Sequence, residues 1–238
     1  MSKPKSPGYQ SKQAWLENRF SEGLKLKILH ERGGRKTAFI EYIPGEYAWR
    51  AVHAPGYLVI HCLWVVGKSK GKGYGKQLLQ ACLDDARVQG KQGVAIVTTD
   101  ATWLPKKKFF LANGFVEIDQ APPCFQLLVY RFDDTPMPSF PHDWESRLAA
   151  FGAGLTVVRT SQCPYIENAA ASILQLAAEA GIPARQVEQR TAQEVQAQAP
   201  CAYGVFGVVL DGKLLSYIYL AKKDFEKRLT ALSQGASG

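Results

Sequence analysis

The sequence predicts an α/β protein built from two domains. The run YLVIHCLWVV at residues 57–66 has the unbroken apolar character of a strand that is covered on both faces of a sheet. A glycine-rich loop and an amphipathic helical pattern follow it directly. Residues 132–146, FDDTPMPSFPHDWES, contain three prolines and four acidic residues without periodicity, which indicates a linker. The 238 residues are enough to bury a core on each side of that linker.

Before the linker, helical and strand patterns follow one another along the chain. Trp15, Leu16 and Phe20 have helix spacing within residues 9–20. Residues 24–30 alternate between apolar and polar side chains, as expected of a strand. The remaining predicted elements are strand 37–43 after the turn signal Arg32-Gly33-Gly34, strand 57–66, a helix with the apolar stripe Leu78, Leu79, Cys82, Leu83 and Ala86, strand 93–99, helix 103–115 closed by Gly114, and strand 125–132.

After the linker, strands and helices alternate before a final hairpin and helix. Asp211-Gly212 between two apolar runs is a strong hairpin signal. The predicted elements are strand 155–160, helix 164–180 with Pro164 at its first position, strand 184–188, helix 191–198, strand 205–210, strand 214–220 and helix 222–232. This β-α-β-α-β-β-α order is that of the thioredoxin fold. The predicted division is a first domain over residues 1–135, a linker over residues 136–146 and a thioredoxin-like domain over residues 147–238.

Composition narrows the classes of function. The net charge of +8 favours an anionic partner, but Lys and Arg are spread along the chain and are not interleaved with aromatic residues, which argues against nucleic acid. No run of 18 apolar residues occurs, and MSKPKSPGYQ at the start lacks the apolar core of a signal peptide, so we expect a cytoplasmic protein without membrane attachment. The five scattered cysteines predict free thiols and no metal site.

The glycine-rich loop, Lys70-Gly71-Lys72-Gly73-Tyr74-Gly75, is the strongest indication of function. Glycines between a buried strand and a helix let backbone N–H groups approach a ligand, and a helix N-terminus favours negative charge, so the loop suits phosphate. A nucleotide-hydrolysing loop needs Ser or Thr after Gly-Lys, whereas Gln77 follows Lys76 here. The G-x-G-x-G spacing also differs from the G-x-G-x-x-G of dinucleotide-binding proteins. A phosphate outside these two classes is therefore expected.

The loop resembles the GNAT acyltransferase signature, in which Arg or Gln is followed by x-x-Gly-x-Gly or x-x-Gly-x-Ala. Lys70 replaces the usual Arg or Gln. The similarity widens to the YoaP-type two-domain acetyltransferases through AFIEYIPGEYAWR, HCLWVVGKSKGKGYGKQLL, KKFFLANGF, APPCFQLLVYRF, SQCPYIENAAASI and GVVLDGKLLSYI. The resemblance implies a GNAT mixed β-sheet with flanking helices. It also implies that the family's first strand and helix are missing, because residues 9–20 already resemble the helix that leads to the second strand.

The resemblance implies acetyl-CoA as the cofactor and assigns its binding residues. The central strand LWV would pair with the pantetheine arm through the backbone of Leu63 and Val65, while the amides from Lys70 to Lys76 would cradle the pyrophosphate. The implied cofactor-binding residues are Leu63, Trp64, Val65, Lys70, Gly71, Lys72, Gly73, Tyr74, Gly75 and Lys76. The alternative interpretation is an ordinary glycine-rich turn under a surface helix.

The same resemblance implies direct transfer of acetyl to a primary amine of a small molecule or peptide. Such transfer needs an oxyanion donor, for which the Leu63 amide is the candidate, and a base, for which Glu41 and His61 are candidates. Glu41 as a solvent-facing strand residue and His61 as a core histidine are the competing interpretations. Strand alternation predicts that Cys62 points away from His61 as a core residue. Phe110 occupies the position where many family members carry a tyrosine acid.

The second domain contains a cysteine with a possible function of its own. Cys163 precedes Pro164 at a strand-to-helix junction and resembles the glutaredoxin Cys-Pro-Tyr-Cys loop, with Ile166 in place of the second cysteine. Cys201 is a possible distant partner, and Pro200 is a candidate for the cis-proline of thioredoxin folds. We expect a domain that has kept the fold and lost redox catalysis, and that binds substrate or supports a homodimer. The alternative function is a thiol-dependent binding or sensing protein that uses Cys163.

Overall fold

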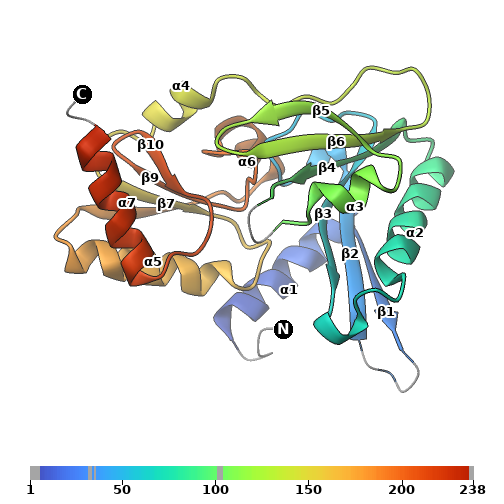
Figure 1. The fold of residues 1–238 in the computed structure, drawn as a ribbon, viewed down its shortest axis with the longest axis horizontal. Helices are drawn as coiled ribbons and strands as arrows, with labels where there is room; N and C mark the ends of the chain where they lie inside the picture. The colour runs from blue at the N-terminus through green and yellow to red at the C-terminus, as the bar shows by residue number, and fades with distance from the viewer. Residues whose placement is uncertain (1–5, 32–33, 35, 101–103, 236–238) are drawn as a thin grey trace. The chain divides into compact units, whose positions relative to one another are not determined.

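The chain forms two compact units in the computed structural model, which describes residues 6–31, 34, 36–100 and 104–235. One unit consists of Leu16–His142, and the other combines Met1–Trp15 with Asp143–Gly238 (Figure 1). Helix α1, Pro7–Phe20, crosses this division, which the sequence pattern does not indicate. None of the helices in the described part of the chain is long and apolar enough to cross a membrane.

The Leu16–His142 unit is built on a six-stranded mixed sheet in the order β1-β2-β3-β4-β6-β5. Only β3 and β4 of this sheet run parallel, and the other neighbours are antiparallel. Its strands are β1 Lys25–His30, β2 Lys36–Pro44, β3 Tyr57–Val65, β4 Gly93–Thr98, β5 Val116–Ala121 and β6 Phe125–Arg131. The predicted strands 24–30, 37–43, 57–66, 93–99 and 125–132 are therefore all present.

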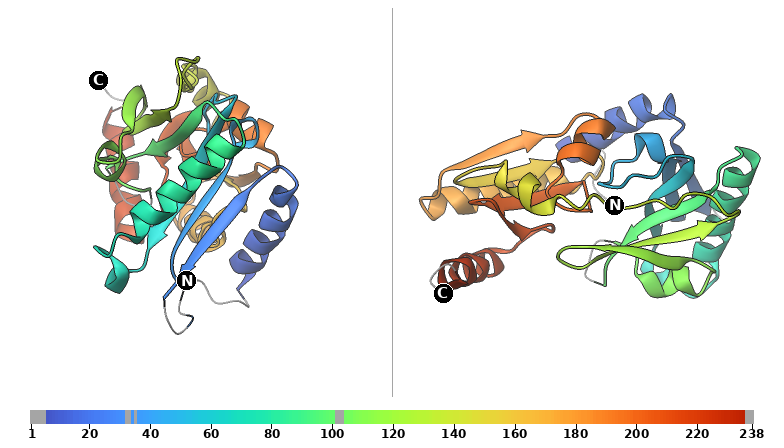
Figure 2. Two further views of the ribbon diagram at one scale, coloured as in Figure 1. Left: turned by 90° about the vertical axis from the view of Figure 1, so that its right-hand side faces the viewer. Right: turned by 90° about the horizontal axis from the view of Figure 1, so that it is seen from above.

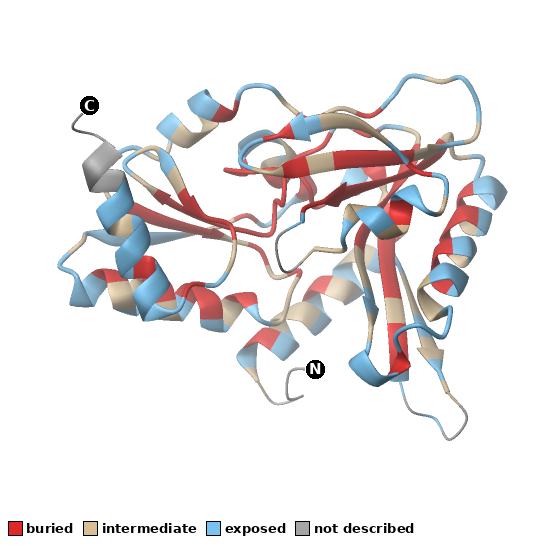
Figure 3. Ribbon diagram, viewed as in Figure 1, coloured by how far each residue is buried: buried red, intermediate tan, exposed pale blue. Residues whose placement is uncertain are grey.

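Helix α2, Tyr74–Val88, covers one face of this sheet. Figure 2 (left) shows it lying alongside the strands, and Figure 3 shows that β4 and β6 are largely buried. The predicted apolar stripe of the helix is the buried one: Leu78, Leu79, Cys82, Leu83 and Ala86 pack in one core with Ile40, Tyr42, Leu58, Ile60, Val94, Ile96 and Leu128. Removing these side chains from water is the main force that holds the helix on the sheet.

Four elements of this unit differ from the sequence prediction. Strand β5 is not predicted, because VEIDQA is a half-exposed edge strand that pairs with β6 alone and lacks a clear apolar alternation. The predicted helix 103–115 shrinks to α3, Lys107–Leu111, with Pro105 and Lys106 outside it, while residue 103 lies outside the described part of the chain. Short 3-10 helices, η1 Gly45–Tyr47 and η2 Gly67–Ser69, complete the unit.

A polar network ties α2 to the sheet. Lys27 Nζ on β1 donates to Asp85 Oδ1 on α2 at 2.8 Å, and the hydroxyl of the buried Tyr42 donates to Asp85 Oδ2. Burial acts to raise the pKa of the Asp85 carboxyl, but hydrogen bonds from Lys27 and Tyr42 outweigh it and hold that pKa below its ordinary value. Burial and the bond to Asp85 raise the pKa of Tyr42, which therefore stays a donor.

We expect Asp85→Asn to lower the free energy of unfolding by about 1–3 kcal/mol at pH 7, the range for hydrogen bonds that involve a charged group. A carboxyl with a lowered folded-state pKa stabilises above its unfolded pKa, and this contribution is lost as pH falls through the folded pKa. The difference between wild type and variant should therefore shrink below about pH 4. Urea unfolding at pH 7 and at acid pH measures it.

The control for this prediction is Asp84→Asn, the same change at the neighbouring position on α2. Asp84 contacts Arg87 and Gln80 of its own helix, and its side chain is 59% exposed. Equal stability losses in the two variants would show that the link from α2 to β1 and β2 contributes nothing.

The second unit contains a four-stranded sheet in the order β10-β9-β7-β8, with β7 and β8 parallel and the other pairs antiparallel. The order of strands and helices is the predicted one. The elements are α4 Trp144–Ala149, β7 Leu155–Arg159, α5 Ile166–Glu179, β8 Ala184–Glu188, α6 Ala192–Gln198, β9 Phe206–Leu210, β10 Lys213–Ser216 and α7 Lys222–Gly235. Helix α4, at the end of the predicted linker, is not predicted.

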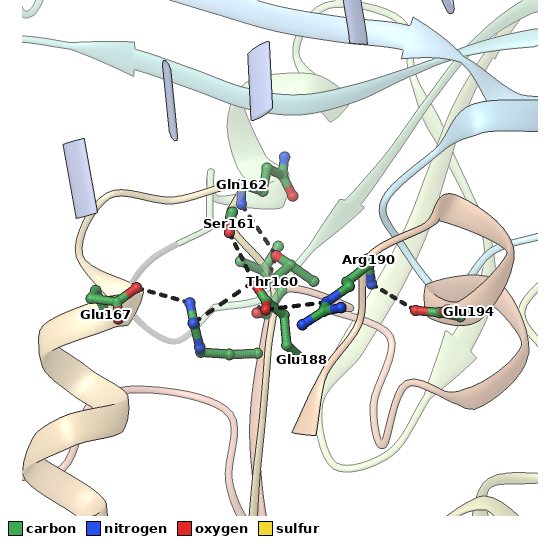
Figure 4. A network of polar contacts seen from close by, with 9 residues as sticks. Thr160, Ser161, Gln162, Glu167, Glu188, Arg190 and Glu194 are labelled. Carbon is green, nitrogen blue, oxygen red and sulfur yellow. Dashed lines mark hydrogen bonds and ion pairs between the residues drawn. The ribbon is translucent and has the colours of Figure 1, made fainter. Parts of the chain in front are cut away.

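Charged residues connect the ends of β7 and β8 to the helices α5 and α6 (Figure 4). Arg159 lies 2.9 Å from Glu167 and 3.7 Å from Glu188, while the Ser161 hydroxyl donates to Glu188 at 3.2 Å. The Arg190 backbone N–H donates to Glu194 at 2.6 Å. These contacts fix the segment that leads from β7 into α5.

Three local predictions for the second unit are wrong. The strand predicted over 214–220 ends at Ser216, whose hydroxyl bonds to Ile218 in a local turn instead of extending the hairpin. Helix α5 begins at Ile166, two residues after Pro164, because the Ile166 N–H bonds to Cys163 O in a turn that precedes the helix. The cis peptide bond in the described residues joins Pro122 and Pro123, so Pro200 is not a cis-proline.

Candidate functional site

The central parallel pair of strands parts midway along its length. Pairing between β3 and β4 runs from Tyr57↔Gly93 to Ile60↔Ile96 and then stops, although β3 continues to Val65 and β4 to Thr98. Each strand stays paired on its outer side, β3 with β2 up to Val65 and β4 with β6 up to Thr98. Among the described residues, β3 from residue 61 to residue 65 thus has no strand partner on its β4 side, and we call this unpaired stretch the gap. An extended ligand can pair with it as a further strand.

A β-bulge at His61 marks the beginning of this gap. In the β2–β3 register Glu41 pairs with Cys62 and Tyr42 pairs with Ile60, which leaves His61 as an extra residue on β3. Cys62 shares the face of its partner Glu41, and His61 contacts Glu41 as well. The prediction that Cys62 points to the face opposite His61 is therefore wrong, because strand alternation fails at a bulge.

The structure brings the two candidate bases together. His61 Nδ1 lies 3.3 Å from Glu41 Oε1, and each residue is 2% exposed. The backbone N–H of Trp49 donates to His61 Nε2 at 3.0 Å, which requires that nitrogen to be unprotonated and places the ring proton on Nδ1. Glu41 is thus not the solvent-facing residue of the competing interpretation. The Nδ1 atom lies beside the Glu41 carboxylate without the geometry of a hydrogen bond.

Arg50 is a member of this cluster that the sequence does not reveal. Its guanidinium is buried, at 2% exposure, and donates to the backbone oxygens of Trp49 and His61. A buried arginine that satisfies the carbonyl of the bulge fixes the backbone where the two strands part. Arg50 follows η1 in a segment without helix or strand periodicity, so no pattern singles it out.

The glycine-rich loop lies between β3 and the N-terminus of α2. Gly71 and Gly73 both have φ +80°, a left-handed conformation that favours glycine, and a Cβ on either would meet no atom within 4 Å. Gly73 is the N-cap residue of α2, and no side chain caps that end of the helix. Gly75 lies in the first turn, where a Cβ would be 3.4 Å from the Phe109 ring.

The remaining predicted cofactor residues lie along the gap and the loop. Leu63 and Val65 are half-buried and pack against the core under α2, whereas Trp64 on the opposite face is 55% exposed. The Lys70 ammonium lies 5.9 Å from the centre of the Trp64 ring. Of the loop residues, Lys70, Gly71, Lys72, Gly73 and Lys76 are exposed, and Tyr74 and Gly75 are half-buried.

This arrangement fits an extended ligand that ends in a pyrophosphate. The gap beside β3 offers backbone groups to an amide-containing chain, and the open glycines and first turn of α2 offer N–H groups and positive charge to an anion. Lys70, Lys72 and Lys76 add positive charge on or beside the loop. The pantetheine arm and pyrophosphate of CoA have this chemistry.

Phe110 is placed where it can donate no proton. It is fully buried, and its ring makes edge contacts with Phe109 at 5.1 Å and Phe115 at 5.3 Å. Phe110 is therefore a core residue that anchors α3, and its side chain has no proton to donate as an acid.

The cysteines of the second unit show no disulfide. None of the five cysteines, all of which lie in the described part of the chain, is in a disulfide, in agreement with the prediction. Cys163 is half-buried in the turn before α5, while Cys201 is buried, with its Sγ 3.9 Å from Phe206 O. Burial also raises the pKa of the Cys82 thiol in the first unit, which is a core residue of α2.

Comparisons with known proteins agree with this geometry. Residues 2–115 match the model of the Acetyltransferase (GNAT) family. The uncharacterized N-acetyltransferase YoaP of Bacillus subtilis is 32% identical over 93% of this chain and 88% of its own length. The L-methionine sulfoximine/L-methionine sulfone acetyltransferase of Pseudomonas aeruginosa is 32% identical over 34% of this chain and 44% of its own.

A solved structure of the same family is also similar to this chain. The GNAT family N-acetyltransferase YhbS from Escherichia coli in complex with CoA is 16% identical and aligns over 59% of this chain and 80% of that one, with a TM-score of 0.40. The family match and the near full-length similarity to YoaP settle the assignment. The chain belongs to the GNAT family of acetyltransferases and is an acyltransferase.

Proposed function

We propose that this enzyme transfers acetyl from acetyl-CoA directly to the primary amine of a small molecule or peptide. The observation that supports the proposal is the parting of β3 and β4 next to an open glycine loop at the N-terminus of α2. In this proposal the backbone of Leu63 and Val65 binds the pantetheine arm, and the amides from Lys70 to Lys76 bind the pyrophosphate. Trp64 lies beside the arm on the exposed face.

Acetyl-CoA supplies an activated acetyl group when it is bound. The residues of the chain then have two tasks, to polarise the carbonyl oxygen and to accept the proton of the amine. The Leu63 N–H, two residues beyond the bulge, is the proposed donor to the carbonyl oxygen. Because the Trp49 N–H occupies His61 Nε2 and the other ring nitrogen carries the ring proton, we assign proton acceptance to the Glu41 carboxylate. His61 holds that carboxylate in place and is a positioning residue.

Glu41 is nearly buried, so the proton reaches it through a water molecule at the end of the gap. The proton for the departing thiolate comes from solvent in this proposal, because Phe110 occupies the tyrosine position among aromatic rings. Arg50 serves the reaction indirectly by holding the carbonyl of His61 and thereby the shape of the bulge.

The acceptor carries a primary amine in this proposal. The Pseudomonas relative is named for L-methionine sulfoximine and L-methionine sulfone, which are small amino acids with a primary amine. We therefore place amino acids and their analogues first among the acceptors to assay, before polyamines and peptide N-termini.

The test is the release of free CoA thiol from acetyl-CoA in the presence of each amine, with mass detection of the acetylated product. Isothermal titration with acetyl-CoA alone establishes whether the cofactor binds independently of the acceptor. A well-folded chain that binds neither acetyl-CoA nor CoA would disprove the proposal, whereas binding without turnover would direct the search to other acceptors.

We propose further that the second unit is thioredoxin-like and has lost redox catalysis. Its sheet order and the single parallel pair β7–β8 support the fold assignment. The CysXXCys pair is absent because Ile166 replaces the second cysteine, and the buried Cys201 forms no disulfide. Slow alkylation of Cys163 at neutral pH, at the rate of an ordinary thiol, is the expected result, and a rapid reaction at pH 6 would contradict it.

A further inference from the structure

We propose that Glu31 is a positioning residue for the cofactor loop. The inference rests on the proposed role of that loop in binding the pyrophosphate of CoA. Glu31 directly follows β1 and is remote in sequence from the loop that it contacts. Its carboxylate is the shared acceptor for three side chains of the loop and of the first turn of α2.

The three contacts meet on a single oxygen atom. Glu31 Oε1 accepts from Tyr74 Oη at 3.0 Å, from Lys72 Nζ at 3.0 Å and from Ser69 Oγ at 3.4 Å. Ser69 ends η2 at 1% exposure, and Tyr74 is the first residue of α2. The contacts therefore hold both ends of the segment that contains Gly71 and Gly73.

This segment benefits from an external tether because it contains two exposed glycines. Gly71 and Gly73 have the largest backbone freedom of any residue type, and neither has an atom within 4 Å of the place where a Cβ would be. An anion site made of backbone N–H groups is effective only when those groups are fixed before the ligand arrives. The Glu31 side chain is itself restrained, with 17% of its surface exposed.

The negative charge of Glu31 beside a phosphate site also opposes binding of the pyrophosphate. Lys72 neutralises Glu31, and loss of the carboxylate would release an ammonium that could attract the pyrophosphate instead. This electrostatic gain is screened by salt, whereas the ordering of the loop is not. The two effects are thus separable by ionic strength, and positioning should dominate in high salt.

The test measures the Kd of CoA and of 3′-dephospho-CoA by isothermal titration in low and in high salt. We expect Glu31→Ala to raise both Kd values about tenfold in high salt, because ordering one or two residues costs about that much. Glu31→Gln keeps an oxygen that accepts from Tyr74 and Ser69 but has no charge, so it should restore binding to within about twofold of wild type. An equal loss in both variants, or no loss in Glu31→Ala, would overturn the inference.

The matched control is Glu46→Ala. The Glu46 carboxylate also has two partners: it accepts from the Gly56 backbone N–H at 2.8 Å, and it lies 3.8 Å from Lys91 Nζ. Glu46 belongs to η1, however, and these partners lie in the segments before β3 and after α2. It should leave both Kd values unchanged. If wild type fails to bind CoA at all, the proposed function is wrong; if wild type binds and Glu31→Ala binds equally, only the role of Glu31 is wrong.

Discussion

Replacing Gly73 by aspartate is expected to raise the Kd for acetyl-CoA by about 100-fold or more, because like charges brought together in an interface cost several kcal/mol. Gly73 is the N-cap of α2 at φ +80°, and its Cβ position is open, so the new carboxylate would lie in the proposed anion site without displacing other atoms. Isothermal titration of the variant with acetyl-CoA measures the effect, and the melting temperature shows whether the fold is intact.

Gly90→Asp is the control for this change. Gly90 follows the other end of α2, also has a positive φ of +63° and also has no atom within 4 Å of a Cβ. The variant therefore carries the same charge change and a similar backbone strain on the same helix. Loss of binding in both variants would point to damage to α2, and tight binding by Gly73→Asp would show that the pyrophosphate lies elsewhere.

The position of the loop is predictable from the sequence because each of its causes is local. An apolar run, glycines in succession and a helical apolar stripe predict β3, the turn and α2 without knowledge of any other segment. Burial of Leu78, Leu79, Cys82, Leu83 and Ala86 follows from their spacing alone. The family resemblance then adds the identity of the ligand.

The bulge and its cluster are not predictable in the same way. His61 becomes an extra residue only in relation to the register of β2, and register is a property of the paired strands. Arg50 comes from an aperiodic segment, and Glu31 acts from the end of another strand on a loop far along the sequence. Edge strand β5 escapes prediction because its side chains are only partly covered. The features that adjust the site therefore depend on tertiary contacts.

Glu41→Gln is expected to lower kcat by about 100-fold or more, the usual contribution of a positioned base, with little change in KM for acetyl-CoA. The amide keeps the shape of the carboxylate, whose oxygen lies 3.3 Å from His61 Nδ1, but it cannot take up a proton. The effect should therefore fall on turnover and leave the cofactor loop and the melting temperature nearly unchanged. Steady-state thiol release with a confirmed acceptor amine measures both constants.

Glu117→Gln on β5 provides the comparison, since it removes a strand carboxylate from the same sheet. This carboxylate contacts Lys107 and Gln120. This control should keep the wild-type kcat. Raising the pH separates a catalytic role from a structural one, because a higher fraction of neutral amine reduces the need for a base. Partial recovery of kcat by Glu41→Gln at alkaline pH supports proton acceptance by Glu41. If the kcat of Glu41→Gln equals that of wild type at every pH, the Glu41–His61 pair is only a structural contact at the bulge.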